Sequence, residues 1–215
     1  MSDELLAMLE ARSPKFTPGR GGVPELTALD VASALGMGAD KFASLAFQIV
    51  RGGSVHMFPQ VDELLACHQF GEWRERAERM VDAQLKVACA HRSGQGLQHA
   101  KLELEGARAA MWPPLNDYDG RYEMIRRAVV AELRFPRICQ MCQGTKHITK
   151  DSRVIDCTEC RAAGVIPISD RQRAIAMKVD HANYLRAWRP VYEWTYWHVS
   201  DAVITGREEF EAALK

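Results

Sequence analysis

The sequence predicts a mostly α-helical protein: a helical core, a small four-cysteine zinc-binding finger, and a helix-turn-helix-like pair after the finger. Three observations predict this fold. Apolar residues recur at helical spacing through most of the chain before residue 137. Two Cys-x-x-Cys pairs come next, and beyond them two capping signals open two successive helices. We therefore divide the chain into an N-terminal arm, a helical core, the finger and the C-terminal helices, at residues 1–25, 26–136, 137–168 and 169–215.

The segments before the finger predict helices separated by breakers. Residues 1–25 hold a run rich in Pro and Gly without an apolar period, so we expect a mobile arm, followed by a short helix capped at Thr27. Further helices are expected over about residues 39–50, from Pro59, and over 73–90, 97–110 and 120–134. The side chains expected to point inward on the 39–50 and 73–90 helices are Phe42, Leu45, Ala46, Ile49, Trp73, Ala77, Met80, Val81, Leu85 and Ala88.

The remaining cysteines and the charge distribution add two expectations. Cys67 and Cys89 have no partner motif, and we interpret them as small buried apolar residues. The chain of 215 residues has a net charge of zero, but residues 120–189 carry +7, against −4 before and −3 after that block. A local basic field favours a polyanionic partner, although solvated helix faces would also produce it.

Two Cys-x-x-Cys pairs separated by 14 residues predict a tetrahedral metal site. The expected ligands are Cys139, Cys142, Cys157 and Cys160. Four thiolates leave no open coordination position, so we expect one structural Zn²⁺ per chain. Disulfides are disfavoured because no basic secretory signal precedes them, and a thioredoxin-like redox pair would need a βαβ context. The spacing alone does not distinguish zinc from an iron–sulfur cluster.

The stretch after the finger predicts a DNA-reading helix pair. Ser169 with Gln172 forms a capping box for one helix, and Asp180 is a suitable N-cap for a longer one. Expected base contacts are Asn183, Arg186 and Arg189, and expected phosphate contacts are Arg171, Arg173 and Lys178. Pro190 should kink or end the second helix about a turn earlier. The aromatic residues between 184 and 197 suit core packing better than stacking on single-stranded bases.

Three stretches give the chain a resemblance to the family of the phage lambda antitermination protein Q. They are LTALDVASALGM at residues 26–37, the two cysteine knuckles, and WRPVY at residues 188–192. The family's knuckles tend to have the form Cys-x-x-Cys-x-Gly-x-Gly, and Lys146 and Ala162 replace two of those glycines here. Residues 70–120 match poorly.

The resemblance implies a phage late-gene transcription antitermination factor. Its partners would be double-stranded DNA near a promoter and bacterial RNA polymerase, with the sigma factor as a further candidate. The main alternative is a conventional helix-turn-helix repressor or activator with a structural zinc; a chaperone-like zinc module and a docking protein are others. No catalytic motif is recognisable, so we expect no enzymatic activity. No apolar run approaches the length of a membrane span, so we expect a cytoplasmic protein.

Overall fold

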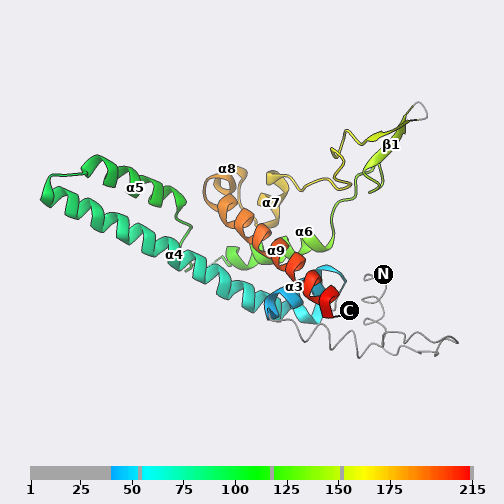
Figure 1. Cartoon of the computed structure of the whole chain (residues 1–215), viewed down its shortest axis with the longest axis horizontal. Coiled ribbons are helices and arrows are strands. Elements are labelled where there is room, and N and C mark those ends of the chain that lie inside the picture. The colour runs from blue at the N-terminus through cyan, green and yellow to red at the C-terminus, as the bar shows by residue number, and fades with distance from the viewer. Residues whose placement is uncertain (1–39, 53–54, 117–118, 151–152, 214–215) are drawn as a thin grey trace.

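The computed structural model describes residues 40–52, 55–116, 119–150 and 153–213, and it is mostly helical (Figure 1). The expected arm and the helix at Thr27 lie outside the described residues. The helices are α3 (Lys41–Val50), η1 (Val55–Met57), α4 (Phe58–Ser93), α5 (Leu97–Ala110), α6 (Arg121–Arg134), α7 (Asp170–Ala176), α8 (His181–Asn183), the π-helical η2 (Tyr184–Trp188) and α9 (Arg189–Ala213). Strands β1 (His147–Lys150) and β2 (Arg153–Asp156) form one antiparallel sheet, with Ile148 opposite Ile155.

The core lies where α3, the first half of α4, α6 and α9 meet. Helix α3 begins at Asp40, whose carboxylate accepts the backbone N–H groups of Phe42 and Ala43. The four α3 residues expected to face inward are all buried, as predicted, and Ala43, Ser44 and Phe47 are buried as well. Gly206 allows α9 to cross α3 closely, because a Cβ at this position would lie 2.3 Å from the carbonyl oxygen of Ala43.

A polar network ties α4, α6 and α9 together inside this core. Arg126 donates to both carboxylate oxygens of Asp62, at 2.7 and 3.0 Å, and to Gln69 Oε1 at 3.0 Å. The Gln69 side-chain amide donates to Thr195 Oγ1 at 2.8 Å, and Thr195 donates to the carbonyl of Val191. The buried polar groups of Gln69 and Thr195 are therefore satisfied, as their burial requires.

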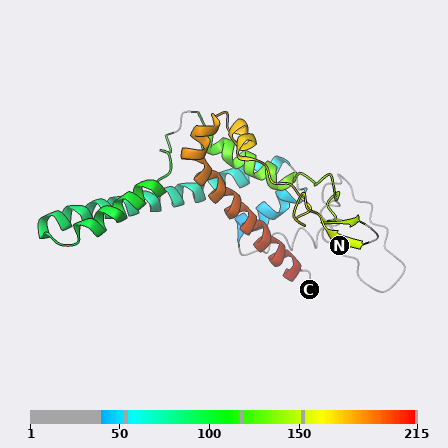
Figure 2. The same cartoon turned by 90° about the horizontal axis from the view of Figure 1, so that it is seen from above.

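Helix α4 differs from the prediction, because it continues for 36 residues through Gly71. Its second half leaves the core and packs against α5, forming a hairpin that projects from the body of the molecule (Figures 1 and 2). Gly94 and Gly96 make the turn with φ of 71° and 70°. Val81, Leu85 and Ala88 are consequently exposed, so their expected inward orientation is wrong.

Both cysteines of α4 are exposed as well, so the expectation that Cys67 and Cys89 are buried is wrong. Residue type alone predicts burial for these cysteines, but it does not say whether the side chain points to the core or to solvent. A free cysteine packs as a small apolar residue only where the fold covers it.

The predicted capping signals after the finger are confirmed. Ser169 and Gln172 form the capping box of α7, and the Asp180 carboxylate accepts the backbone N–H of Asn183 to begin α8. Pro190 does disturb the helix about a turn earlier, as expected, but it does not stop the chain from continuing as α9. Instead, the preceding turn widens to the π form, in which the backbone N–H of Arg189 bonds to the carbonyl of Tyr184. The wider turn accommodates the missing proline N–H and its ring.

Candidate metal centre and nucleic-acid interface

The structure brings the four predicted cysteines together as one buried cluster whose sulfur atoms all lie within 4.8 Å of one another. Cys139 Sγ lies 3.8 Å from Cys157 Sγ, and Cys142 Sγ lies 3.6 Å from Cys160 Sγ. Four sulfurs about 2.3 Å from a tetrahedral zinc would be separated by about 3.8 Å. A disulfide would need about 2.05 Å. The spacing therefore fits a single metal ion, with zinc as a compatible occupant.

Backbone N–H groups lie close to the Cys157 thiol and favour its ionised form. The N–H groups of Cys160 and Glu159 lower the pKa of the Cys157 thiol to about 7, against the opposing effect of desolvation. Gly164 N–H lies 3.2 Å from Cys160 Sγ. The pKa of the Cys139 thiol is raised instead: the backbone N–H of Cys142 lowers it, but burial and the contact with Cys157 outweigh that effect. Thiolate is the form that binds a metal, so Cys157 is the ligand of this pair that ionises first.

Left-handed backbone conformations close both knuckles. The first knuckle uses Gly144 and Lys146, with φ of 84° and 71°, and the second uses Ala162 and Gly164, with φ of 60° and 80°. Lys146 and Ala162 adopt this left-handed conformation although each carries a Cβ. A residue with a Cβ is strained there.

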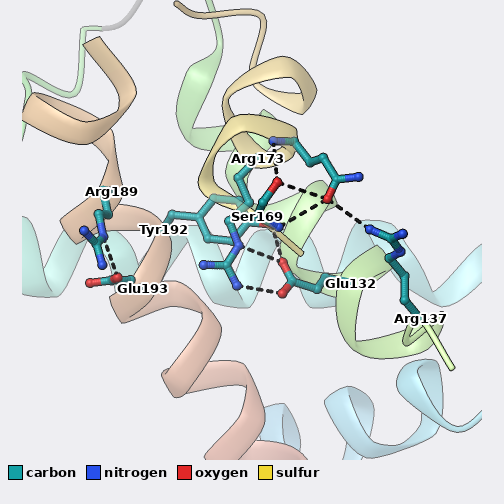
Figure 3. A network of polar contacts seen from close by, with 8 residues as sticks. Glu132, Arg137, Ser169, Arg173, Arg189, Tyr192 and Glu193 are labelled. Carbon is teal, nitrogen blue, oxygen red and sulfur yellow. Dashed lines mark hydrogen bonds and ion pairs between the residues drawn. The ribbon is translucent and has the colours of Figure 1, made fainter. Parts of the chain in front are cut away.

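The finger is closed at its base by pairing of the two segments that enter and leave it. Cys139 N–H bonds to the carbonyl of Gly164 at 3.0 Å, and Ile166 N–H bonds to the carbonyl of Arg137 at 2.8 Å. The Arg137 side chain also donates to Gln172 Oε1 at 3.1 Å, and Gln172 belongs to the capping box of α7 (Figure 3). The base of the finger therefore contacts the start of the predicted DNA-binding pair.

Three of the predicted nucleic-acid contacts are exposed on this pair. Arg171 lies on α7, Lys178 in the turn with φ of 54°, and Arg186 on η2. Within the described part of the chain, no ion pair involves any of the three. Their charges are free of internal neutralisation by neighbouring carboxylates, as a polyanion-binding surface requires.

Arg173 is placed differently, because its side chain is only 13% exposed and faces the core. It donates from Nε to Glu132 Oε2 at 3.1 Å and from Nη2 to Glu132 Oε1 at 2.6 Å, and its guanidinium lies over the Tyr192 ring (Figure 3). A buried and neutralised guanidinium is unsuited to phosphate contact. We therefore leave Arg173 out of the proposed DNA contacts.

The two remaining candidates are also partly engaged. Arg189 pairs with Glu193 at 2.8 Å and lies 3.8 Å from Asp170 of α7. Asn183 is half-buried. Regular helical spacing already sets these two residues about 120° apart around the axis, and the π turn between them changes that angle.

Sequence reasoning missed Glu132, the buried partner of Arg173. The signal was present, since Glu132 follows Ile125 and Val129 at the apolar helical period of α6. A carboxylate at such a position needs a buried partner. The helical spacing predicts that Glu132 is buried, but it does not identify the distant residue that pairs with its carboxylate.

Comparison with protein-family models, with curated proteins and with solved structures finds no match to this chain. The resemblance to the lambda Q family therefore stays a prediction. Among the helices of the described residues, none combines the length and the apolar character needed to cross a lipid bilayer.

Proposed function

We propose that the chain binds one structural Zn²⁺ through its four clustered cysteines. Support comes from two sulfur separations, of 3.8 and 3.6 Å, that match the edge of a tetrahedral zinc–thiolate site, from the clustering of all four sulfurs within 4.8 Å, and from the burial of all four residues. A finger of this size has little apolar interior of its own, with Ile148 and Ile166 packed against the cysteines. The ion would supply most of the energy that keeps the finger folded.

We further propose that α7, α8 and η2 bind double-stranded DNA. The observation that carries this proposal is the set of exposed basic residues on two helices and on the four-residue turn that joins them. Arg186 is the base-reading candidate, and Arg171 and Lys178 are placed at phosphates. The Arg137–Gln172 contact supports a role for the metal finger in orienting this pair. Arg189 would have to exchange Glu193 for a base, so we rank it below Arg186.

We propose transcription antitermination as the outcome of that binding, with bacterial RNA polymerase as the protein partner and its sigma factor as a further candidate. The three sequence stretches that resemble the lambda Q family support this step. In this scheme the chain recognises a promoter-proximal DNA element, joins polymerase there and makes it read through terminators.

Fluorescence anisotropy with DNA from the promoter region adjoining the gene tests the binding step. Arg186→Ala should weaken specific binding by about 1–3 kcal/mol while affecting unrelated DNA less. The matched control is Arg207→Ala, an exposed arginine that pairs with Glu211 near the other end of α9. Equal affinity for unrelated DNA, with no effect of Arg186→Ala, would remove the DNA-reading assignment.

Run-off transcription past an intrinsic terminator tests the second step. The protein should raise readthrough on a template that carries its promoter region and leave a template without that region unchanged. A conventional repressor or activator would bind the same DNA and change initiation without raising readthrough. Binding without readthrough would therefore select that alternative.

A further inference from the structure

The outer face of the α4–α5 hairpin carries an exposed apolar stripe. Val81 is 51% exposed and Leu85 is 59% exposed, and Ala88 and Cys89 are exposed next to them. Successive α-helical residues are about 100° apart, so these four positions share one face of α4. The buried residue Ala83 lies on the opposite side and lines the cleft between α4 and α5. Within the described residues, this stripe is therefore left uncovered.

We propose that the stripe binds the same stripe of a second copy of the chain, with the two α4 helices antiparallel and a twofold axis at Leu85. A closed twofold contact uses the same patch on both subunits, so a residue on the axis meets its own copy. Leu85 would then pack against Leu85 of the partner subunit. Val81 would pack against Ala88 of the partner subunit, with an offset of about one residue, or 1.5 Å, along the helix axis.

Charge complementarity selects this register. Glu78 and Arg92 lie seven residues to either side of Leu85, each about 20° from its direction around the helix. Both side chains are exposed, and Glu78 has only a loose pair with Arg74 at 3.7 Å. The twofold axis at Leu85 brings Glu78 level with Arg92 of the partner subunit, and the reciprocal pair forms at the other end.

Two other registers are less favourable. An axis at Ala83 would set Arg74 level with Arg92 of the partner subunit, and an axis at Glu78 would set two carboxylates against each other. Like charges directly opposed across a contact are destabilising. Of these three registers, only the one centred on Leu85 pairs an apolar centre with opposite charges at both ends.

The shape of the molecule leaves room for this arrangement, since the hairpin projects away from the core (Figures 1 and 2). In the proposed register the end of the partner's α4 comes level with Ala77, short of Trp73, where α4 joins the core. The contact is one helix pair, which is smaller than the roughly 1,600 Å² typical of stable complexes. We therefore expect a dimer with a dissociation constant of about micromolar order.

Sedimentation equilibrium of the full-length metal-loaded protein over a concentration series tests the dimer. Leu85→Glu should raise the dissociation constant about tenfold or more, since it places two carboxylates on the axis. Its helical circular dichroism should be unchanged, because the site is on a solvent face. The matched control is Leu102→Glu on α5, where Leu102 is 66% exposed, and it should leave the dimer intact. A protein that stays monomeric up to about 100-fold above the expected micromolar constant overturns the proposal.

Charge reversal tests the register. Glu78→Arg and Arg92→Glu should each raise the dissociation constant about three- to tenfold, and the double variant should restore it to about the wild-type value. In a Cys67→Ser, Cys89→Ser background, Leu85→Cys should form a disulfide-linked dimer on mild oxidation, and Leu102→Cys should not. Failure of the double reversal to restore binding, or crosslinking that is no more efficient at position 85, rejects the twofold axis at Leu85.

Discussion

Arg173 of α7 and Glu132 of α6 lie side by side in the core, joined by two hydrogen bonds of 3.1 and 2.6 Å although 41 residues separate them in the sequence. Tyr192 of α9 donates its hydroxyl to the same Glu132 carboxylate at 2.8 Å. Burial opposes the charge of Arg173, yet the bonds to Glu132 raise its pKa above the usual value. This triad fastens the start of the proposed DNA-binding pair to the core.

Arg173→Ala should lower the free energy of unfolding by about 3–5 kcal/mol, because it leaves the carboxylate of Glu132 buried without its counter-charge. Urea denaturation measures the change. The matched control is Arg171→Ala, two positions earlier on the same helix and exposed, which should alter stability by less than about 0.5 kcal/mol. An Arg173→Ala protein as stable as the wild type would contradict the ion pair.

The close crossing of α3 and α9 gives a second prediction. Gly206→Ala should destabilise the protein by about 1–3 kcal/mol, because the new methyl group would meet the Ala43 carbonyl and force the helices apart. Gly71→Ala is the control, since a Cβ there meets nothing within 4 Å and the position is helical. It should stabilise α4 by about 0.5–1 kcal/mol. Thermal unfolding of both variants compares them, and equal effects would argue against the crossing.

The strained knuckle residues give a third prediction. Ala162→Gly and Lys146→Gly should each strengthen the finger by about 1 kcal/mol, because φ of 60° and 71° are strained for residues with a Cβ. Competition with a chromophoric chelator would show this as about fivefold tighter metal binding per substitution. Gly164→Ala should act in the opposite direction, since its Cβ would lie 2.9 Å from the carbonyl oxygen of Gly144. Weaker metal binding by Ala162→Gly would contradict the strain.

Features that depend on local sequence were predictable. The α3 stripe, the Ser169 capping box and the Asp180 cap each rest on residues within one or two helical turns, and the structure contains all three. The cysteine cluster was also predictable, because two closely spaced ligand pairs leave one simple way to assemble four thiolates. In each case the separation of the residues along the sequence determines how their side chains are arranged.

Features that depend on distant partners were not predictable. The apolar face of α4 around Leu85 has helical periodicity, but periodicity does not say whether a protein core covers that face. Arg173 has the residue type of a phosphate contact, and only the fold reveals Glu132 beside it. Pro190 indicated a disturbed helix, but the sequence around it does not distinguish a break from the π turn that the structure contains, with Tyr184 and Trp188 buried at its two ends.

The contact between His68 of α4 and His198 of α9 gives a prediction for pH dependence. His198 Nε2 lies 2.9 Å from His68 Nδ1, and its ring stacks on Trp194. Burial, followed by the charge of His68, lowers the pKa of His198, with Asp201, Asp40 and Glu72 opposing. The folded state therefore binds a proton on His198 less readily than the unfolded state does, so this residue favours folding above about pH 6.5 and destabilises the fold as pH falls below that value.

Replacing His198 by Gln should reduce the loss of stability between about pH 7.5 and 5.5. Urea midpoints of the wild type and the variant, measured in parallel across that range, give the comparison. Any contribution of the metal site to acid sensitivity is common to both proteins and cancels in the difference. A steeper loss in the variant would contradict the assigned direction of the pKa shift.

Metal removal should unfold the finger and leave the helical core standing. The cysteine cluster is separate from the main apolar cluster, and apart from the ion its support is limited to Ile148, Ile166 and the backbone bonds at its base. A strong chelator should therefore make the finger sensitive to protease while the helical circular dichroism falls little, and added Zn²⁺ should restore protection. Cys142→Ser should reproduce the chelator's effect, and Cys89→Ser, at an exposed cysteine of α4, should not.

Because Arg137 at the base of the finger bonds to Gln172 of α7, the affinity for DNA should fall in parallel with the protection of the finger from protease. Loss of the whole helical signal on chelation would instead mean that the core and the finger fold as one unit.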